Sequence, residues 1–222
     1  MNAASRPVHS GQEGPHRDLD LLLRRHAAHP YLKPLLEHNQ QAFDTAIAAW
    51  QAWNKEAPLV LDAGCGVGWS TLKLAERFPE HFVLGVDQSL DRLSRGKPMP
   101  LPDNAAFVRA DLVDFWRLLH AAGVTLARHY LLYPNPWPKI GHLGRRWHGH
   151  PVFPVLLALG GQLECRSNWR IYVEELAQAI TLLTGVSAGV EDFDPGDEPL
   201  TPFEAKYAAS GHRLYRLVAE LS

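Results

Sequence analysis

Apolar runs alternate with amphipathic stretches along most of this chain, in a pattern typical of strands that alternate with helices. The apolar run PLVLDAGCG, at residues 58–66, predicts a strand that ends in glycines, and WSTLKLAERF, at 69–78, predicts an amphipathic helix. Further strands are predicted at 81–87, 105–111, 128–133 and 161–167, and further helices at 89–96, 113–123, 152–160 and 171–185. Because such alternation builds parallel βαβ units, we predict an α/β fold with a doubly wound, mainly parallel sheet.

The two ends of the chain depart from this alternation. Residues 1–33 are polar and rich in His and Arg, so we expect a mobile arm over the first 18 residues and a short helix at 19–27. A longer helix is predicted from Pro34, since proline suits a first helical position. The tail predicts an acidic loop at 191–199, a helix at 201–210 and a last strand at 212–221. We therefore predict a partly disordered arm, 1–33, and one domain, 34–222.

Composition and charge narrow the classes of protein that fit. The chain has 222 residues, of which 46% are hydrophobic, and this suits a single domain with its own core. It contains no apolar run of membrane-spanning length and no secretory signal, so we expect no membrane partner. With only two cysteines, a reduced, cytoplasmic setting fits better than a disulfide framework. A formal net charge of −2 means that nucleic-acid binding must depend on a local basic patch.

A glycine-rich turn follows the first predicted strand and opens a helix. It contains Gly64, Gly66 and Gly68, directly after Asp62. An ordinary tight turn rarely needs three alternating glycines, and a dinucleotide site prefers G-x-G-x-x-G, with its third glycine one residue later. The third alternative is S-adenosylmethionine, which has no pyrophosphate to bind and whose positive charges suit a carboxylate. We favour that cofactor.

Two more acids end the next two predicted strands. Asp87 ends the second, where a carboxylate can accept both ribose hydroxyls, and Asp111 ends the third, near the expected place of an adenine. Each acid alone would more often be a helix cap or a turn residue. Because Asp62, Asp87 and Asp111 follow three parallel strands in order, we expect them to line one crevice.

A stiff loop, YPNPWPK at residues 133–139, follows the fourth predicted strand. Proline cannot donate to a ladder, so the chain must leave the sheet there and hold Asn135 within a narrow geometry. Lys139, Arg145 and Arg146 follow as the densest basic cluster of the chain, which suits contacts with RNA phosphates, although a solvated charged loop is the plainer alternative. We expect no metal site, because the nearby histidines match no helical spacing and no cysteine lies near them.

Four uncommon strings in this sequence resemble motifs of the bacterial tRNA (guanine-N7)-methyltransferase family. They are PNPWPK at 134–139, RR at 145–146, SNW at 167–169 and TPFE at 201–204, and they occur in the family's order. Members of the family carry P-D-P-W-P-K, R-R, T-D-W and T-x-[YF]-E at these places. With the glycine-rich turn, the resemblance covers roughly residues 58–219.

The resemblance implies a fold, a reaction and a set of site residues. It implies a seven-stranded, Rossmann-like methyltransferase sheet with an antiparallel last strand, S-adenosylmethionine as cofactor and tRNA as substrate. We expect neither DNA nor a membrane as partner, and a monomer or a homodimer. The cofactor-binding residues would be Asp62, Gly64, Gly66, Gly68, Asp87, Asp111 and Asn135, with Asn135 also catalytic. The substrate-binding residues would be Lys139, Arg145, Arg146, Asn168, Thr201, Phe203 and Glu204.

Two positions depart from the family pattern: the acid of its loop is Asn135 here, and the acid of its T-D-W string is Asn168. Guanine N7 carries a free lone pair, so its methylation needs no general base. The product ring is cationic, however, and a carboxylate would stabilise it better than an amide dipole. The chain therefore methylates N7 slowly, compensates with Glu204 or another acid, or acts on another base or acceptor. A non-catalytic RNA-binding protein that keeps the cofactor pocket is the alternative of a different class.

Overall fold

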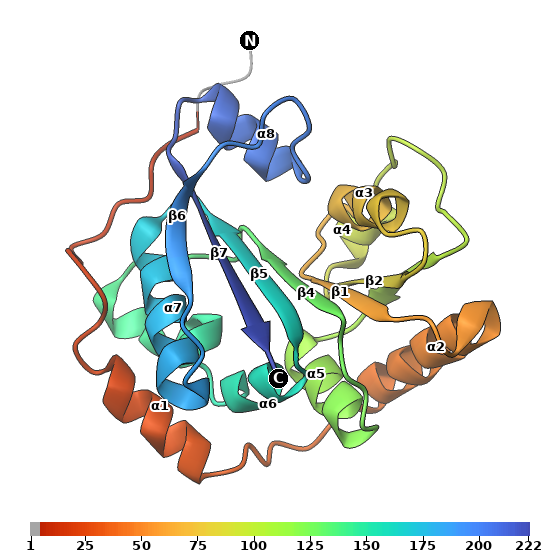
Figure 1. Cartoon of the computed structure of the whole chain (residues 1–222), viewed down its shortest axis with the longest axis horizontal. Coiled ribbons are helices and arrows are strands. Elements are labelled where there is room, and N and C mark those ends of the chain that lie inside the picture. Colours follow the sequence, from red (N-terminus) through yellow and green to blue (C-terminus); the bar gives the residue numbers. More distant parts are fainter. Residues whose placement is uncertain (1–4) are drawn as a thin grey trace.

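A seven-stranded sheet with helices packed on both faces organises the computed structural model, which describes residues 5–222 (Figure 1). The strands lie in the order β3-β2-β1-β4-β5-β7-β6. Neighbours from β3 to β5 are parallel, and β7 runs antiparallel to both β5 and β6. This confirms the predicted α/β class and the antiparallel last strand.

The strands are β1 (Leu59–Ala63), β2 (Phe82–Asp87), β3 (Ala105–Arg109), β4 (Arg128–Leu132), β5 (Gly161–Ser167), β6 (Gly189–Phe193) and β7 (Leu214–Leu221). The α-helices are α1 (Leu19–Ala28), α2 (Glu37–Asn54), α3 (Trp69–Arg77), α4 (Leu90–Ser94), α5 (Leu112–Ala121), α6 (Phe153–Ala158), α7 (Arg170–Thr184) and α8 (Pro202–Ala209). Two 3₁₀ helices, η1 (Ile140–Arg145) and η2 (Trp147–Gly149), lie between β4 and α6.

The strand order places two loops on either side of a crevice. The chain builds outward from β1 to β2 and β3, and then returns to place β4 on the other side of β1. At such a switch point the loops after the two central strands diverge, and ligands of doubly wound folds bind between them. Here these loops are the glycine-rich turn after β1 and the proline-rich loop after β4.

Alternate residues of the strands face two apolar layers. Leu59 and Leu61 point into the larger layer, which includes side chains of α1, α2, α5, α6 and α7. Val60 points to the other face, where Leu74 and Ala75 of α3 cover it. Both faces of the central strands are therefore dry, as a parallel sheet requires. Within residues 5–222, no helix combines the length and the apolar character that crossing a bilayer demands.

The N-terminal arm differs from the mobile segment that the sequence suggested. Residues 1–4 lie outside the described part of the chain, but from Ser5 onward the arm follows the body and leads into α1 (Figure 1). Leu19 and Leu23 of α1 are fully buried, and α1 packs on α7. The helix predicted from Pro34 begins instead at Glu37, after an extended linker. The described residues of this segment therefore contact the body of the protein.

The strand β6 lies where the sequence predicted the start of an acidic loop. Its residues Glu191 and Asp192 are exposed and form ion pairs with Arg216 of β7 and with Arg213, just before β7. Acidic residues have low strand propensity, so the local pattern gave no sign of this element. A charged edge strand is a common device against edge-to-edge association.

A neutral histidine lies in the larger apolar layer. His129 of β4 is fully buried, and its Nε2 accepts a hydrogen bond of 3.1 Å from the indole Nε1 of Trp116. Burial lowers the pKa of this imidazole from 6.5 to about 3.

This histidine makes stability depend on pH. Below pH 6.5 the unfolded chain binds a proton at His129 whereas the folded chain does not, so the free energy of unfolding should fall as pH drops from 6.5 towards 3. His129→Gln keeps an acceptor for Trp116 but cannot ionise. In urea unfolding, its loss of stability over this interval should be shallower than that of the wild type by up to about 1.4 kcal/mol per pH unit. The exposed His120→Gln is the control, and equal slopes for wild type and His129→Gln would contradict the assignment.

Candidate active site

The glycine-rich turn between β1 and α3 needs its glycines for conformation and for space. Gly64, Gly66 and Gly68 have φ values of 79°, 59° and 82°, in the left-handed region that side chains disfavour. A Cβ atom on Gly68 would lie 2.4 Å from the ring of Phe107. The N–H groups of Gly64, Cys65, Gly66 and Gly68 donate within the protein. What the glycines offer a cofactor is therefore a close approach to the main chain at the start of α3.

Asp62 joins the last part of β1 to the first turn of α3. Its Oδ2 accepts hydrogen bonds from Ser70 Oγ (2.6 Å) and Thr71 Oγ1 (2.7 Å). Burial raises the pKa of this carboxyl to about 6, although both hydrogen bonds act against the rise. Since both bonds fall on Oδ2, Oδ1 remains available to a donor on a ligand.

Asp87 and Asp111 also hold local structure. Asp87 is buried, and its carboxylate accepts from the backbone N–H of Gly66 (3.0 Å) and of Ser89 (2.8 Å). It therefore braces the glycine-rich turn from the neighbouring strand. Asp111 caps α5 by accepting from Val113 N, and is partly exposed. The structure brings all three acids to the carboxyl ends of β1, β2 and β3, as the sequence predicted.

The proline loop, residues 133–139, is strained and tightly held. Tyr133 and Trp137 have φ values of 52° and 45°, which are rare for residues other than glycine and cost free energy that neighbouring contacts must offset. The Tyr133 hydroxyl donates to Glu204 Oε1 (2.9 Å). Asn135 lies exposed, and its Oδ1 accepts a long hydrogen bond of 3.3 Å from Trp137 N. This loop therefore presents Asn135 to solvent on a fixed backbone.

A buried charge cluster lies beneath the proline loop. Glu204 of α8 is fully buried and accepts from Arg166 Nη1 (3.0 Å), from the N–H of Leu200 (2.6 Å) and from Tyr133. Arg166 Nε also donates to Glu164 (2.7 Å). The sequence suggested that Glu204 contacts the target base, but the structure commits its carboxylate to these internal donors. Thr201 caps α8 by accepting from Glu204 N.

The basic cluster divides into exposed and buried members. Lys139 and Arg145 are exposed, and the Arg145 guanidinium lies over the ring of Trp137, 4.8 Å from its centroid. Arg146 is fully buried and forms an ion pair with Glu175 at 2.5 Å. The predicted phosphate contact therefore fits Lys139 and Arg145, whereas Arg146 has no path to a phosphate in this structure.

Asn168 follows β5, beside the proline loop, and contacts a histidine that the sequence did not single out. Its Nδ2 lies 3.2 Å from Nδ1 of His212, and Nε2 of His212 lies 3.0 Å from the carbonyl oxygen of Ser5. His212 also stacks on Tyr207, while Phe203 on the same helix is 53% exposed. Nothing in the local sequence marks His212, because its role comes from contacts between distant segments.

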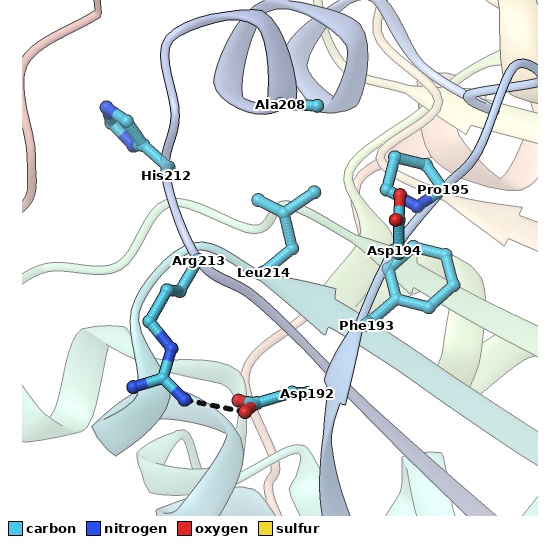
Figure 2. A pocket seen from close by; sticks show the side chains of 8 residues that line it. All are labelled: Asp192, Phe193, Asp194, Pro195, Ala208, His212, Arg213 and Leu214. Carbon is cyan, nitrogen blue, oxygen red and sulfur yellow. Dashed lines mark hydrogen bonds and ion pairs between the residues drawn. The ribbon is translucent and has the colours of Figure 1, made fainter.

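An open pocket of about 380 Å³ lies next to this region rather than at the crevice (Figure 2). Its lining residues come from the end of β6, the loop after it, α8 and the start of β7, and Arg213 pairs with Asp192 on one side (Figure 2). None of the glycines and none of the three strand-end acids line it. This pocket therefore lies away from the residues that the sequence assigned to the cofactor.

A glycine in β2 leaves the space that a hydroxyl group needs in order to donate to Asp62. A Cβ atom on Gly85 of β2 would lie 2.2 Å from Thr71 Oγ1, so Gly85→Ala should push Thr71 off Asp62. We expect the free energy of unfolding to fall by about 1–3 kcal/mol in denaturant titration, as for other overpacked cores. Gly189→Ala, in open space on β6, is the matched control and should not destabilise. Equal stability of the two variants would argue against the contact.

A family model matches most of the chain. The model is described as "Putative methyltransferase" and covers residues 56–217. This span runs from just before β1 to the middle of β7, and it contains every predicted site residue.

Curated relatives and solved structures are similar over most of their length. A tRNA (guanine-N(7)-)-methyltransferase of Pseudomonas savastanoi pv. phaseolicola is 26% identical over 96% of this chain and 93% of its own. One of Bordetella pertussis is 30% identical over 75% of this chain and 68% of its own. Among solved structures, the 16S rRNA methyltransferase KamB has a TM-score of 0.57 and 15% identity, covering 86% of this chain and 96% of its own.

Proposed function

This chain belongs to the tRNA (guanine-N7)-methyltransferase family, whose fold is that of S-adenosylmethionine-dependent methyltransferases, and we propose that it methylates N7 of a guanine in tRNA. The observation that carries the proposal is the meeting of the glycine-rich turn and the proline loop across one switch point. The glycine-rich turn suits the cofactor, and the proline loop suits the base that accepts the methyl group.

The residues around the crevice fit the cofactor. S-adenosylmethionine, when bound, would supply an electrophilic methyl group from which a nucleophile displaces the thioether sulfur. On the protein side, Asp62 Oδ1 would accept from the amino-acid ammonium of the ligand, and the partly exposed Asp111 would face the base. Asp87 would reach the ribose with what remains of its acceptor capacity, since each of its oxygens already accepts one N–H.

The acceptor side requires positioning rather than proton transfer. The N7 lone pair forms the new N–C bond while the S–C bond breaks, and no proton has to move in that step. The proline loop supplies positioning because its strained backbone is held at Tyr133 and Trp137. Lys139 and Arg145, exposed beside it, would hold phosphates of the RNA.

The charge cluster beneath the loop supplies part of the negative charge that Asn135, as an amide, lacks. Glu164 and Glu204 share the single cation Arg166, so the three formal charges sum to −1. A negative field there would stabilise the cationic methylated guanine without touching it. This is the compensation by Glu204 or another acid that the sequence raised as an alternative, although it acts through the buried cluster rather than by direct contact.

The activity is tested by incubating the purified protein with methyl-labelled S-adenosylmethionine and total tRNA, followed by digestion to nucleosides. We expect label in 7-methylguanosine. Binding of S-adenosylhomocysteine by calorimetry, with no label in any nucleoside, would support the non-catalytic alternative. Label in another nucleoside would support the divergent substrate.

Asn135→Asp restores the acid of the family's loop. An aspartate can accept the same hydrogen bond from Trp137 N, so the loop should keep its shape. Because a carboxylate stabilises the cationic ring better than an amide, we expect kcat for 7-methylguanosine formation to rise by about 10²-fold, the usual size of such an electrostatic contact. Asn54→Asp, at the end of α2, is the matched control. An unchanged or lower rate for Asn135→Asp would show that the amide serves the native substrate.

A further inference from the structure

A buried ion pair lies directly behind the proline loop. Arg146, at the junction of η1 and η2, and Glu175 of α7 are both fully buried and lie 2.5 Å apart. His148 Nε2 also contacts Glu175, at 2.7 Å. Burial alone would raise the pKa of the Glu175 carboxyl, but the hydrogen bonds and charges of His148 and Arg146 outweigh it and lower that pKa to about 2.

The same arginine holds the backbone of the proline loop. Its Nε and Nη2 donate to the carbonyl oxygen of Trp137, at 3.3 and 3.2 Å. Trp137 is one of the two strained residues of the loop, and its N–H donates to Asn135. The orientation of Arg146 therefore affects Trp137, whose N–H in turn holds the side-chain amide of Asn135.

The N-terminal arm completes this arrangement from the other side. Gln12 accepts from Arg146 Nη2 (3.0 Å) and donates to Glu175 Oε1 (2.5 Å), so it touches both members of the ion pair. The backbone N–H of His16 donates to the same Glu175 oxygen (2.9 Å). The hydroxyl of Ser10 donates to the carbonyl oxygen of Pro138 at 2.6 Å. The arm thus reaches two successive carbonyl groups of the proline loop, one directly and one through Arg146.

We propose that Ser10 and Gln12 are positioning residues for methyl transfer, which act by fixing the carbonyl groups of Pro138 and Trp137 and thereby the place of Asn135. This inference rests on the proposed function. Without Ser10 and Gln12, the loop keeps its prolines but loses two fixed points close to Trp137. The cofactor side of the crevice is untouched, because Asp62, Asp87 and the glycines make no contact with the arm among the described hydrogen bonds. Loss of these residues therefore affects the chemical step and not the cofactor.

The test compares full-length Ser10→Ala, Ser10→Thr, Gln12→Ala and Glu13→Ala. Threonine keeps the hydroxyl of Ser10, and the exposed Glu13 directly follows Gln12 in the sequence. We expect Ser10→Ala and Gln12→Ala to lower kcat on tRNA by about tenfold, since a misplacement of order 1 Å costs up to about a hundredfold. Ser10→Thr and Glu13→Ala should match the wild type. The KM for S-adenosylmethionine and the Kd of S-adenosylhomocysteine should stay within about twofold in all four.

A second measurement does not depend on activity. Hydrogen exchange followed by mass spectrometry should show faster exchange in peptides covering 133–149 of Ser10→Ala and Gln12→Ala, with no change in peptides covering 62–71. Unchanged exchange at 133–149, equal kcat for Ser10→Ala and Ser10→Thr, or a fall in kcat matched by weaker S-adenosylhomocysteine binding would each overturn the inference. If the wild type fails to label tRNA, the proposed function fails, and the exchange experiment alone decides whether the arm holds the loop.

Discussion

The ion pair between Arg146 and Glu175 is the interaction on which the acceptor side of the crevice depends. Two charges taken out of water are costly unless their remaining donors and acceptors are satisfied. Here Glu175 accepts from Gln12, His16, Arg146 and His148, and the spare donors of Arg146 reach a main-chain carbonyl. Three segments far apart in sequence, the N-terminal arm, residues 137–148 and α7, must therefore meet before either charge is stable.

Carboxylates on both sides of the crevice serve first as braces. Asp62 fixes the start of α3, Asp87 fixes the glycine-rich turn, and Glu204 fixes the proline loop through Tyr133. Each accepts from hydroxyl, guanidinium or backbone donors whose loss would leave a buried charge without partners. The field of a buried carboxylate reaches further than its contacts, so these braces also contribute charge to the site. The electrostatics of the site is therefore built into the scaffold.

The spacing of apolar residues predicted most of the fold, because burial of strands and helices in the core imposes that spacing. Strands β1 to β5 and helices α3 to α7 were found within a few residues, since a parallel sheet buried on both faces needs continuous apolar runs. The strand β6 was missed because Glu191 and Asp192 gain their partners only from β7, which is distant in sequence. Polar composition predicts a mobile arm, because it gives no sign of the contacts of Gln12. Local pattern cannot report contacts that the whole fold creates.

The division of the basic cluster shows the same limit at single residues. Arg145 and Arg146 are adjacent and chemically identical, yet one lies over Trp137 in solvent and the other is fully buried. Sequence identifies the charge but not the side of the backbone to which it points, which depends here on the turn between η1 and η2. The structural effect of glycines and prolines is predicted more reliably from sequence, because these residues act on their own backbone conformation. The glycine-rich turn was therefore located correctly, whereas the burial of Arg146 was not foreseen.

The two asparagines that depart from the family pattern are not equivalent. A carbonyl oxygen only accepts hydrogen bonds, so His212 Nε2, 3.0 Å from the carbonyl of Ser5, must carry the proton. In the neutral ring Nδ1 then carries no proton and accepts the hydrogen bond from the side-chain N–H of Asn168. The Oδ1 atom of Asn168 takes no part in this contact. An aspartate there would find a donor only if Nδ1 took up a second proton, so the amide of Asn168 is the partner that matches the neutral ring. Asn135 offers Trp137 N an oxygen that aspartate offers equally well. The departure at 168 is therefore built into its surroundings, whereas the departure at 135 can be reversed without moving a neighbour.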